Sequence, residues 1–199
     1  MKNLIIKVLK KLGYTLKGIK PSIKHNDFNS IVKFLLENKK NVHTYFDIGA
    51  NKGQSIELFK KMNANSQIHS FEPTPKLYRD LVKKFENDKT IKINNIGLGK
   101  EKDILTFYSF NKSSPVNSFL PMDKKSKFYK ARLYNSSSND SNFTNQTKID
   151  VTSVDNYCND NNIKEIDFMK IDTQGFEEEV LQGSKKMLQE QKISIIQLE

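Results

Sequence analysis

The chain has 199 residues, the usual length of one domain, and 36% of them are hydrophobic, which is enough for a folded core. A single cysteine, Cys158, excludes an internal disulfide, and with only three scattered histidines beside it we expect no metal site. The formal net charge is +10, but residues 1–26 carry seven lysines and no acid, which leaves +3 for the rest. Because the net charge of residues 27–199 is close to zero, the sequence argues against a nucleic-acid-binding protein.

The domain organisation that we expect is a basic N-terminal arm at residues 1–26 followed by one domain at residues 27–199. Apolar residues of the arm recur at helical spacing with lysines opposite, which predicts a cationic amphipathic helix. These apolar residues are Ile5, Val8, Leu9 and Leu12. The helix is too short to span a bilayer and no cleavage site follows, so we expect a cytoplasmic protein. Two roles stay open: packing on the domain, which we favour, or peripheral contact of residues 1–20 with an anionic membrane.

The sequence pattern of residues 27–199 predicts an α/β fold. A helix capped by Asp27 or Asn29 and ending at Asn38 is followed by short apolar strands that alternate with helices. This alternation is typical of a parallel sheet covered by helices on both faces. The expected strands are 44–48, 67–71, 91–96, 166–171 and 193–198, and the expected helices are 54–62, 76–86 and 176–189.

The alternation is interrupted by an insertion at residues 111–147, which is rich in Ser, Asn and Lys. Its composition predicts a mobile loop. Exposed strands at 104–110 and 148–153 flank it, and we expect them to pair with each other.

A glycine loop follows the first strand. Gly49 and Gly53 allow a tight turn and close approach of a ligand of nucleotide size. Their spacing departs from the pattern that binds a pyrophosphate, and Asp47 beside them favours a cationic amino-acid moiety over a phosphate. Glu72 ends the second strand, where a carboxylate can accept both hydroxyls of a ribose, although it could also simply begin a turn.

Three segments resemble the FkbM-type methyltransferases, which use S-adenosylmethionine and have a Rossmann-like class I fold. They are FDIGANKGQS at 46–55, FEP at 71–73 and FMKIDTQGFEEEVLQGS at 168–184, with weaker support from NNIGLG at 94–99 and SVDNY at 153–157. The resemblance extends over nearly all of residues 44–199.

This resemblance implies that seven residues bind the cofactor, one contacts the acceptor and one is a candidate catalytic residue. Those on the methionine and ribose side are Asp47, Gly49, Asn51 and Gly53, with Glu72 on the ribose hydroxyls. Asn95 and Gly97 are expected near the adenine. Gln174 and Asp172 are expected beside the reactive methyl, where Gln174 contacts the acceptor. Asp172 is either the general base or a structural carboxylate that caps the next helix or positions the cofactor's amino group.

Two further expectations concern the sheet. Lys170 lies in an apolar strand and should pair at the sheet edge or with an acid such as Asp155. A class I sheet has seven strands, whereas this sequence ends at Glu199, so we expect a sheet lacking the last two strands. Ile193, Ile195 and Ile196 would then lie on an uncovered edge, which a partner contacting residues 193–199 could cover. A fragment, a partnered protein and a truncated inactive protein all stay open.

The function predicted is an S-adenosylmethionine-dependent methyltransferase that O-methylates a carbohydrate or other small hydroxylated acceptor, with the insertion helping to cover the acceptor. One alternative is a nucleic-acid methyltransferase, suggested by the charge but lacking the Asn/Asp-Pro-Pro-Tyr/Phe sequence after the fourth strand. The other is a truncated, non-catalytic, membrane-associated binding protein.

Overall fold

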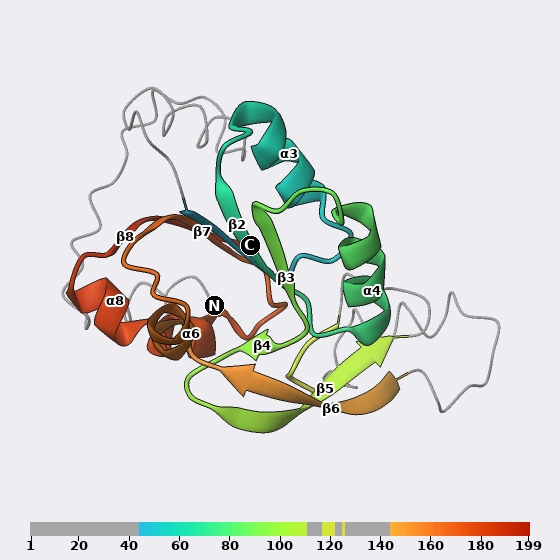
Figure 1. The fold of residues 1–199 in the computed structure, drawn as a ribbon. Coiled ribbons are helices and arrows are strands. Elements are labelled where there is room, and N and C mark those ends of the chain that lie inside the picture. Colours follow the sequence, from blue (N-terminus) through green and yellow to red (C-terminus); the bar gives the residue numbers. More distant parts are fainter. Residues whose placement is uncertain (1–43, 111–116, 122–124, 126–143) are drawn as a thin grey trace.

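The computed structural model describes residues 44–110, 117–121, 125 and 144–199 (Figure 1). The helices predicted in the arm and before Asn38 lie outside these residues, as does most of the insertion. In the first half of the described chain the elements are β1 (Thr44–Ile48), α3 (Gln54–Met62), β2 (Gln67–Phe71), α4 (Pro75–Lys84), β3 (Ile91–Asn94), β4 (Gly97–Leu98) and β5 (Asp103–Phe110). In the second half they are β6 (Thr144–Thr152), α6 (Val154–Asp160), β7 (Ile166–Ile171), α7 (Glu177–Gln182), α8 (Lys185–Gln189) and β8 (Ile193–Leu198).

Five parallel strands form the main sheet, in the order β3-β2-β1-β7-β8. All six residues of β7 are buried, as expected for a continuous apolar strand in the middle of a parallel sheet. The predicted α/β fold with a parallel sheet is therefore confirmed. Of the five predicted strands, only the third differs in its limits, because it ends at Asn94 rather than at residue 96.

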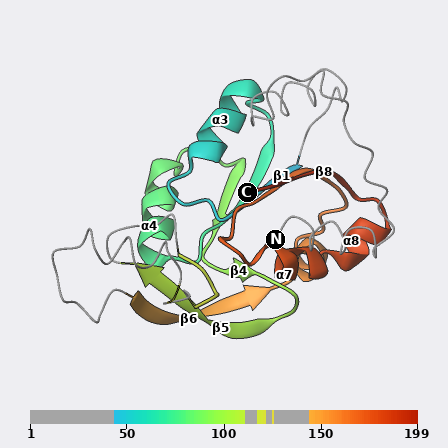
Figure 2. The ribbon, with the colours of Figure 1, turned by 180° about the vertical axis from the view of Figure 1, so that it is seen from behind.

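Helices cover both faces of this sheet (Figures 1 and 2). Alternate strand residues point to opposite faces, so Tyr45 and Phe168 pack with Phe59 of α3, while Phe46 and Met169 belong to the second core cluster. That second cluster contains residues of α6, α7 and α8. Within the described ranges no helix is long and apolar enough to cross a membrane.

A second, three-stranded sheet has the order β4-β6-β5 and lies beside the main one (Figure 1). Its β5 and β6 pair antiparallel from Asp103 opposite Val151 to Phe110 opposite Thr144. The predicted pairing of the strands around the insertion is therefore confirmed, although β6 begins at Thr144, inside the predicted insertion. The two-residue strand β4 was not predicted, and it pairs parallel with β6.

The single helix predicted at 176–189 is wrong, because the chain forms α7 and α8 with a break at Gly183. A Cβ at Gly183 would lie 1.9 Å from the carbonyl oxygen of Gly99, so this close crossing requires glycine. The Gly183 carbonyl accepts a hydrogen bond from the backbone N–H of Asp155 at 3.0 Å. The tertiary contact with the segments at residues 99 and 155 therefore interrupts the helix.

Asp155 caps α8 and does not pair with Lys170, so that predicted pairing is wrong. Its carboxylate accepts from the backbone N–H of Lys186 at 2.7 Å and from that of Met187 at 3.0 Å. An acidic side chain at this position satisfies N–H groups that have no partner within the helix. Asp155 itself belongs to α6, a helix that was not predicted and that Ser153 caps through the N–H of Asn156.

β8 is an edge strand of the main sheet in the described part of the chain, as predicted. Its apolar side chains are less uncovered than expected: Ile193 is buried, and Ile195 and Ile196 pack partly buried against the two core clusters.

Candidate functional site

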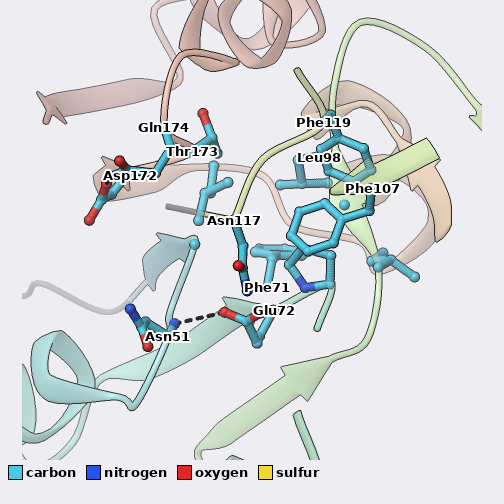
Figure 3. Close-up of a pocket in the computed structure, with 15 residues that line it drawn as sticks. Asn51, Phe71, Glu72, Leu98, Phe107, Asn117, Phe119, Asp172, Thr173 and Gln174 are labelled. Atoms are coloured by element: carbon cyan, nitrogen blue, oxygen red, sulfur yellow. Dashed lines mark hydrogen bonds between the residues drawn. The ribbon is translucent and has the colours of Figure 1, made fainter. Parts of the chain in front are cut away.

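A cavity opens at the carboxyl ends of β1, β2 and β7 (Figure 3). Its empty volume is about 610 Å³, which includes space open to solvent. One end is polar and the other is apolar and aromatic. The polar lining includes Asn51, Glu72, Asn117, Asp172, Thr173 and Gln174, and the apolar lining includes Phe71, Ile96, Leu98, Phe107 and Phe119. Ligands of open α/β sheets bind at this edge.

Gly49 lets the ends of the three strands meet at the cavity. Its φ of 88° is in the left-handed region, and a Cβ there would lie 2.0 Å from the carbonyl oxygen of Asp172. The N–H of Gly49 donates to the Phe71 carbonyl at 3.0 Å, and the N–H of Asp172 donates to the Ile48 carbonyl at 2.9 Å. We expected a ligand to approach Gly49 closely. In the structure it is the backbone after β7, at Asp172, that approaches this glycine.

Gly53 has a similar packing role. A Cβ at this position would lie 2.8 Å from side-chain atoms of Leu81 and Phe85, so the glycine lets the start of α3 approach α4. Gly53 does not line the cavity.

Glu72 is the buried carboxylate of the cavity. Its Oε2 accepts from the backbone N–H of Asn51 at 2.8 Å (Figure 3). Its Oε1 accepts from the backbone N–H of Thr74, also at 2.8 Å. Asn51 adopts a φ of 51°, a left-handed conformation that asparagine tolerates. Burial raises the pKa of Glu72, and the hydrogen bonds from Thr74 and Asn51 oppose that rise. The structure thus brings Asn51 and Glu72 together, and an ionised Glu72 can accept hydroxyl groups of a ligand.

The two residues expected near the adenine differ in position. Gly97 lines the cavity. Asn95 does not, and its side chain instead donates to the backbone carbonyls of Glu72 and Pro73 at 2.9 and 3.1 Å. Asn95 therefore stabilises the turn that carries Glu72.

Asp172 and Gln174 both line the cavity at its polar end (Figure 3). The Oδ1 of Asp172 accepts from Nε2 of Gln174 at 2.8 Å, and its Oδ2 accepts from Nζ of Lys170 at 3.1 Å. Asp172 is thus oriented by an amide on one oxygen and an ammonium on the other.

Lys170 lies within the sheet and pairs with two acids, which confirms the predicted alternative of an acid partner, although the acids are Asp172 and Glu199 and not Asp155. Its side chain is 7% exposed, and its Nζ lies 3.1 Å from Asp172 and 3.7 Å from Glu199. Buried ammonium groups require such partners, because an unpaired charge in the protein interior is costly.

Asp47 is fully buried beside Lys170 and does not line the cavity. It is opposite Lys170 on β7 and opposite Ser70 on β2, so the three side chains share one face of the sheet. Among the described residues, neither carboxylate oxygen of Asp47 has a hydrogen-bond partner. Burial raises the pKa of Asp47 to about 7, the Lys170 ammonium opposes this, and Asp172, Glu72 and Glu199 add to it.

Glu177 is a positioning residue that sequence reasoning missed. It is 1% exposed, and its Oε1 accepts from the N–H and hydroxyl of Thr173, both at 3.1 Å, and from the N–H of Gly175 at 2.9 Å. Between these donors Gln174 and Gly175 adopt φ values of 56° and 105°. The carboxylate therefore holds the loop that carries Gln174. The available signal was an acid in the first turn of a helix, where it can reach back to free N–H groups.

Asn117 and Phe119 of the insertion also line the cavity and were not predicted individually. The sequence around them has no periodicity from which their side chains could be placed. For metal binding, the described ranges contain no group of three or more His, Cys, Asp or Glu residues that could hold an ion.

Comparison with known proteins identifies one family. The model of the FkbM methyltransferase domain matches residues 47–199. The chain is similar to the crystal structure of a methyltransferase FkbM from Methylobacillus flagellatus KT, with 14% sequence identity and a TM-score of 0.48. The alignment covers 94% of this chain but 46% of that one, so the chain spans less than half of that protein's length. No curated protein matches the chain.

Replacing Glu177 by alanine should destabilise the protein by about 1–3 kcal/mol, because three donors would lose their buried acceptor. Urea denaturation measures this change. Glu178→Ala in the same helical turn is the control, since Glu178 is partly exposed and accepts a hydrogen bond from Gln182 of the same helix. Equal stability of the two variants would contradict the role given to Glu177.

Replacing Asp47 by asparagine should change how stability depends on pH. The folded-state pKa of Asp47 is about 7, above its unfolded value, so the folded protein binds the extra proton between about pH 4 and 7. Stability contributed by this protonation is present at low pH and is lost as the pH rises through 7, with a slope of at most about 1.4 kcal/mol per pH unit.

The measurement is the difference in unfolding free energy between wild type and Asp47→Asn at several pH values. We expect wild type to lose stability relative to the variant from pH 4 to 7 and the difference to level off above. A difference that does not vary with pH would show that Asp47 titrates normally.

Proposed function

The chain belongs to the FkbM methyltransferase family, and on this premise we propose that it transfers the methyl group of S-adenosylmethionine to a hydroxyl oxygen of a carbohydrate or another small hydroxylated acceptor. The observation that carries the proposal is the buried Glu72 carboxylate at the end of β2, held by the N–H groups of Asn51 and Thr74 in a cavity with an aromatic end. A carboxylate at this place suits the two hydroxyls of a ribose, and an apolar end suits an adenine ring.

The charges around the cavity fit a cationic cofactor. Among the described residues Asp47 is a buried acid without a hydrogen-bond partner, and its raised pKa means that a nearby cation would favour its ionised form. Asp172 lines the cavity, and Lys170 supplies an ammonium close to both acids. Acids in excess of the nearby cation favour a positively charged group and disfavour a phosphate. Glu72 would hold the ribose, and Asp47 and Asp172 would compensate the charge of the methionine part. When bound, S-adenosylmethionine supplies a methyl group already activated by its sulfonium.

The protein's remaining tasks are to align the acceptor and to receive its proton. Asp172 is the carboxylate that we assign to the proton, since it lies in the cavity wall at the end of β7. Its Oδ1 is hydrogen-bonded to Gln174, whose side chain is exposed and can move to the acceptor instead. Lys170 and Glu177 keep Asp172 and its loop in place.

The character of the acceptor follows from the lining. Thr173, Gln174 and Asn117 offer uncharged hydrogen-bonding groups, and none of the described lining residues is cationic. Such a wall suits a neutral polyhydroxylated molecule better than a polyanion. This supports the carbohydrate proposal over the nucleic-acid alternative.

Binding of S-adenosylhomocysteine, measured by calorimetry, tests the cofactor proposal. We expect the wild type to bind and Glu72→Ala to lose about 1–3 kcal/mol of binding free energy, because a buried acceptor of ligand hydroxyls is removed. Glu86→Ala, at an exposed position on the surface, should bind as the wild type does. A wild type that does not bind S-adenosylhomocysteine would disprove the proposal.

The acceptor class can be tested with isotope-labelled S-adenosylmethionine in an extract of the source cells. We expect label in a carbohydrate or small hydroxylated fraction, detected by mass spectrometry, and much less label with Asp172→Asn. Label found only in nucleic acid would overturn the acceptor class and leave the cofactor assignment intact.

A further inference from the structure

Residues Asn117–Leu120, here called the strap, cross the cavity between the ends of β2 and β7. At one end, Nδ2 of Asn117 donates to Oγ1 of Thr74 at 3.3 Å. At the other, the hydroxyl of Ser118 lies 3.1 Å from the carbonyl oxygen of Gln174, to which it donates. Figure 3 shows Asn117 between Glu72 and the loop of Thr173 and Gln174. The strap therefore joins the two parts of the site that the proposed function assigns to the ribose and to the acceptor.

The backbone of the strap is fixed by the protein itself. The N–H of Ser118 donates to the Tyr108 carbonyl at 3.1 Å, and the N–H of Tyr108 donates to the Ser118 carbonyl at 2.8 Å. The Ser118 hydroxyl also accepts from the N–H of Leu120 at 3.1 Å, and the residue is 6% exposed. A buried residue with its N–H, carbonyl and hydroxyl all bonded holds its neighbour Asn117 in a defined place.

Phe119, the aromatic residue of the strap, packs against two other aromatic rings and a glycine. The ring of Phe119 lies 4.9 Å from that of Phe107 and 5.2 Å from that of Phe176, measured between centroids. A Cβ at Gly97 would lie 2.4 Å from Cζ of Phe119, so the glycine makes room for the ring. These contacts tie the strap to β4, β5 and the start of α7.

A chain of hydrogen bonds leads from the strap to the buried carboxylate. Asn117 donates to the hydroxyl of Thr74, and both the hydroxyl and the N–H of Thr74 donate to the carboxylate of Glu72. Ionised Glu72 can only accept hydrogen bonds, whereas the amide of Asn117 can also donate them. A pair of neighbouring hydroxyls needs both, because each hydroxyl donates its hydrogen and accepts at its oxygen.

We propose that Asn117 is a binding residue for the nucleoside part of the ligand, with its amide directed at the same pair of hydroxyls as Glu72. The strap, which belongs to the insertion, would then complete the nucleoside site through Asn117. This proposal rests on the proposed function, which supplies the adenosyl ligand.

The test is calorimetry with two probes, S-adenosylhomocysteine and 5′-methylthioadenosine, which lacks the amino-acid part. Asn117→Ala should weaken binding of both by a similar factor, about three- to tenfold, the effect of one hydrogen bond. Asn117→Asp should weaken it further, because it replaces the donor by a second carboxylate close to Glu72. Asn65→Ala, at an exposed turn far along the chain from the strap, is the matched control and should leave binding unchanged.

The outcomes separate this inference from the function on which it rests. Wild-type affinity of both Asn117 variants for both probes would overturn the role of Asn117 while leaving the methyltransferase proposal standing. A loss seen with S-adenosylhomocysteine alone would place Asn117 beside the amino-acid part and also overturn it. If wild type binds neither probe, both proposals fail. Thermal unfolding of each variant identifies folding defects. If Asn117→Ala does not fold, Asn117→Asp still tests the role of Asn117, because it keeps the shape of the side chain.

Discussion

The contact between the ends of β1 and β7 is the constraint on which the site depends. With no Cβ at Gly49, the Asp172 carbonyl can occupy the place where one would stand, 2.0 Å away. This approach sets Asp172 and the loop after it beside the glycine loop, and backbone hydrogen bonds connect the same region to Phe71 at the end of β2. Glu72 and Asp172, 100 positions apart in the sequence, therefore line one cavity.

Electrostatics gives this cavity its chemical character. Lys170 is the buried ammonium near Asp47 and Asp172, and Glu72 and Glu199 add further negative charge. Because Asp47 has no hydrogen-bond partner for either oxygen in the part of the chain that the structure describes, its charge is costly unless a cation or a proton compensates it. The same feature therefore supports the proposed cationic ligand and the predicted pH dependence of the stability of the ligand-free protein.

The loops of the site are held by buried polar side chains outside the proposed cofactor residues. Glu177 satisfies three donors of the segment from Thr173 to Gly175, while Ser118 bonds to the carbonyl of Gln174. One loop is thus fixed from the helix that follows it and from the insertion. Such support keeps polar groups of a site in a geometry suited to binding before the ligand arrives.

The sequence by itself determined the parallel α/β sheet, four of its five strand limits and the positions of Glu72 and Asp172 at strand ends, since local apolar patterns and glycine loops specify these features. It also determined the antiparallel pairing around the insertion. Only the tertiary structure decided the break at Gly183, the cap formed by Asp155, the burial of Asp47 and the place of Asn117. Each of these depends on contacts between residues distant in the sequence, such as Gly183 with Gly99 or Asn117 with Thr74, and such contacts leave no local periodicity to read.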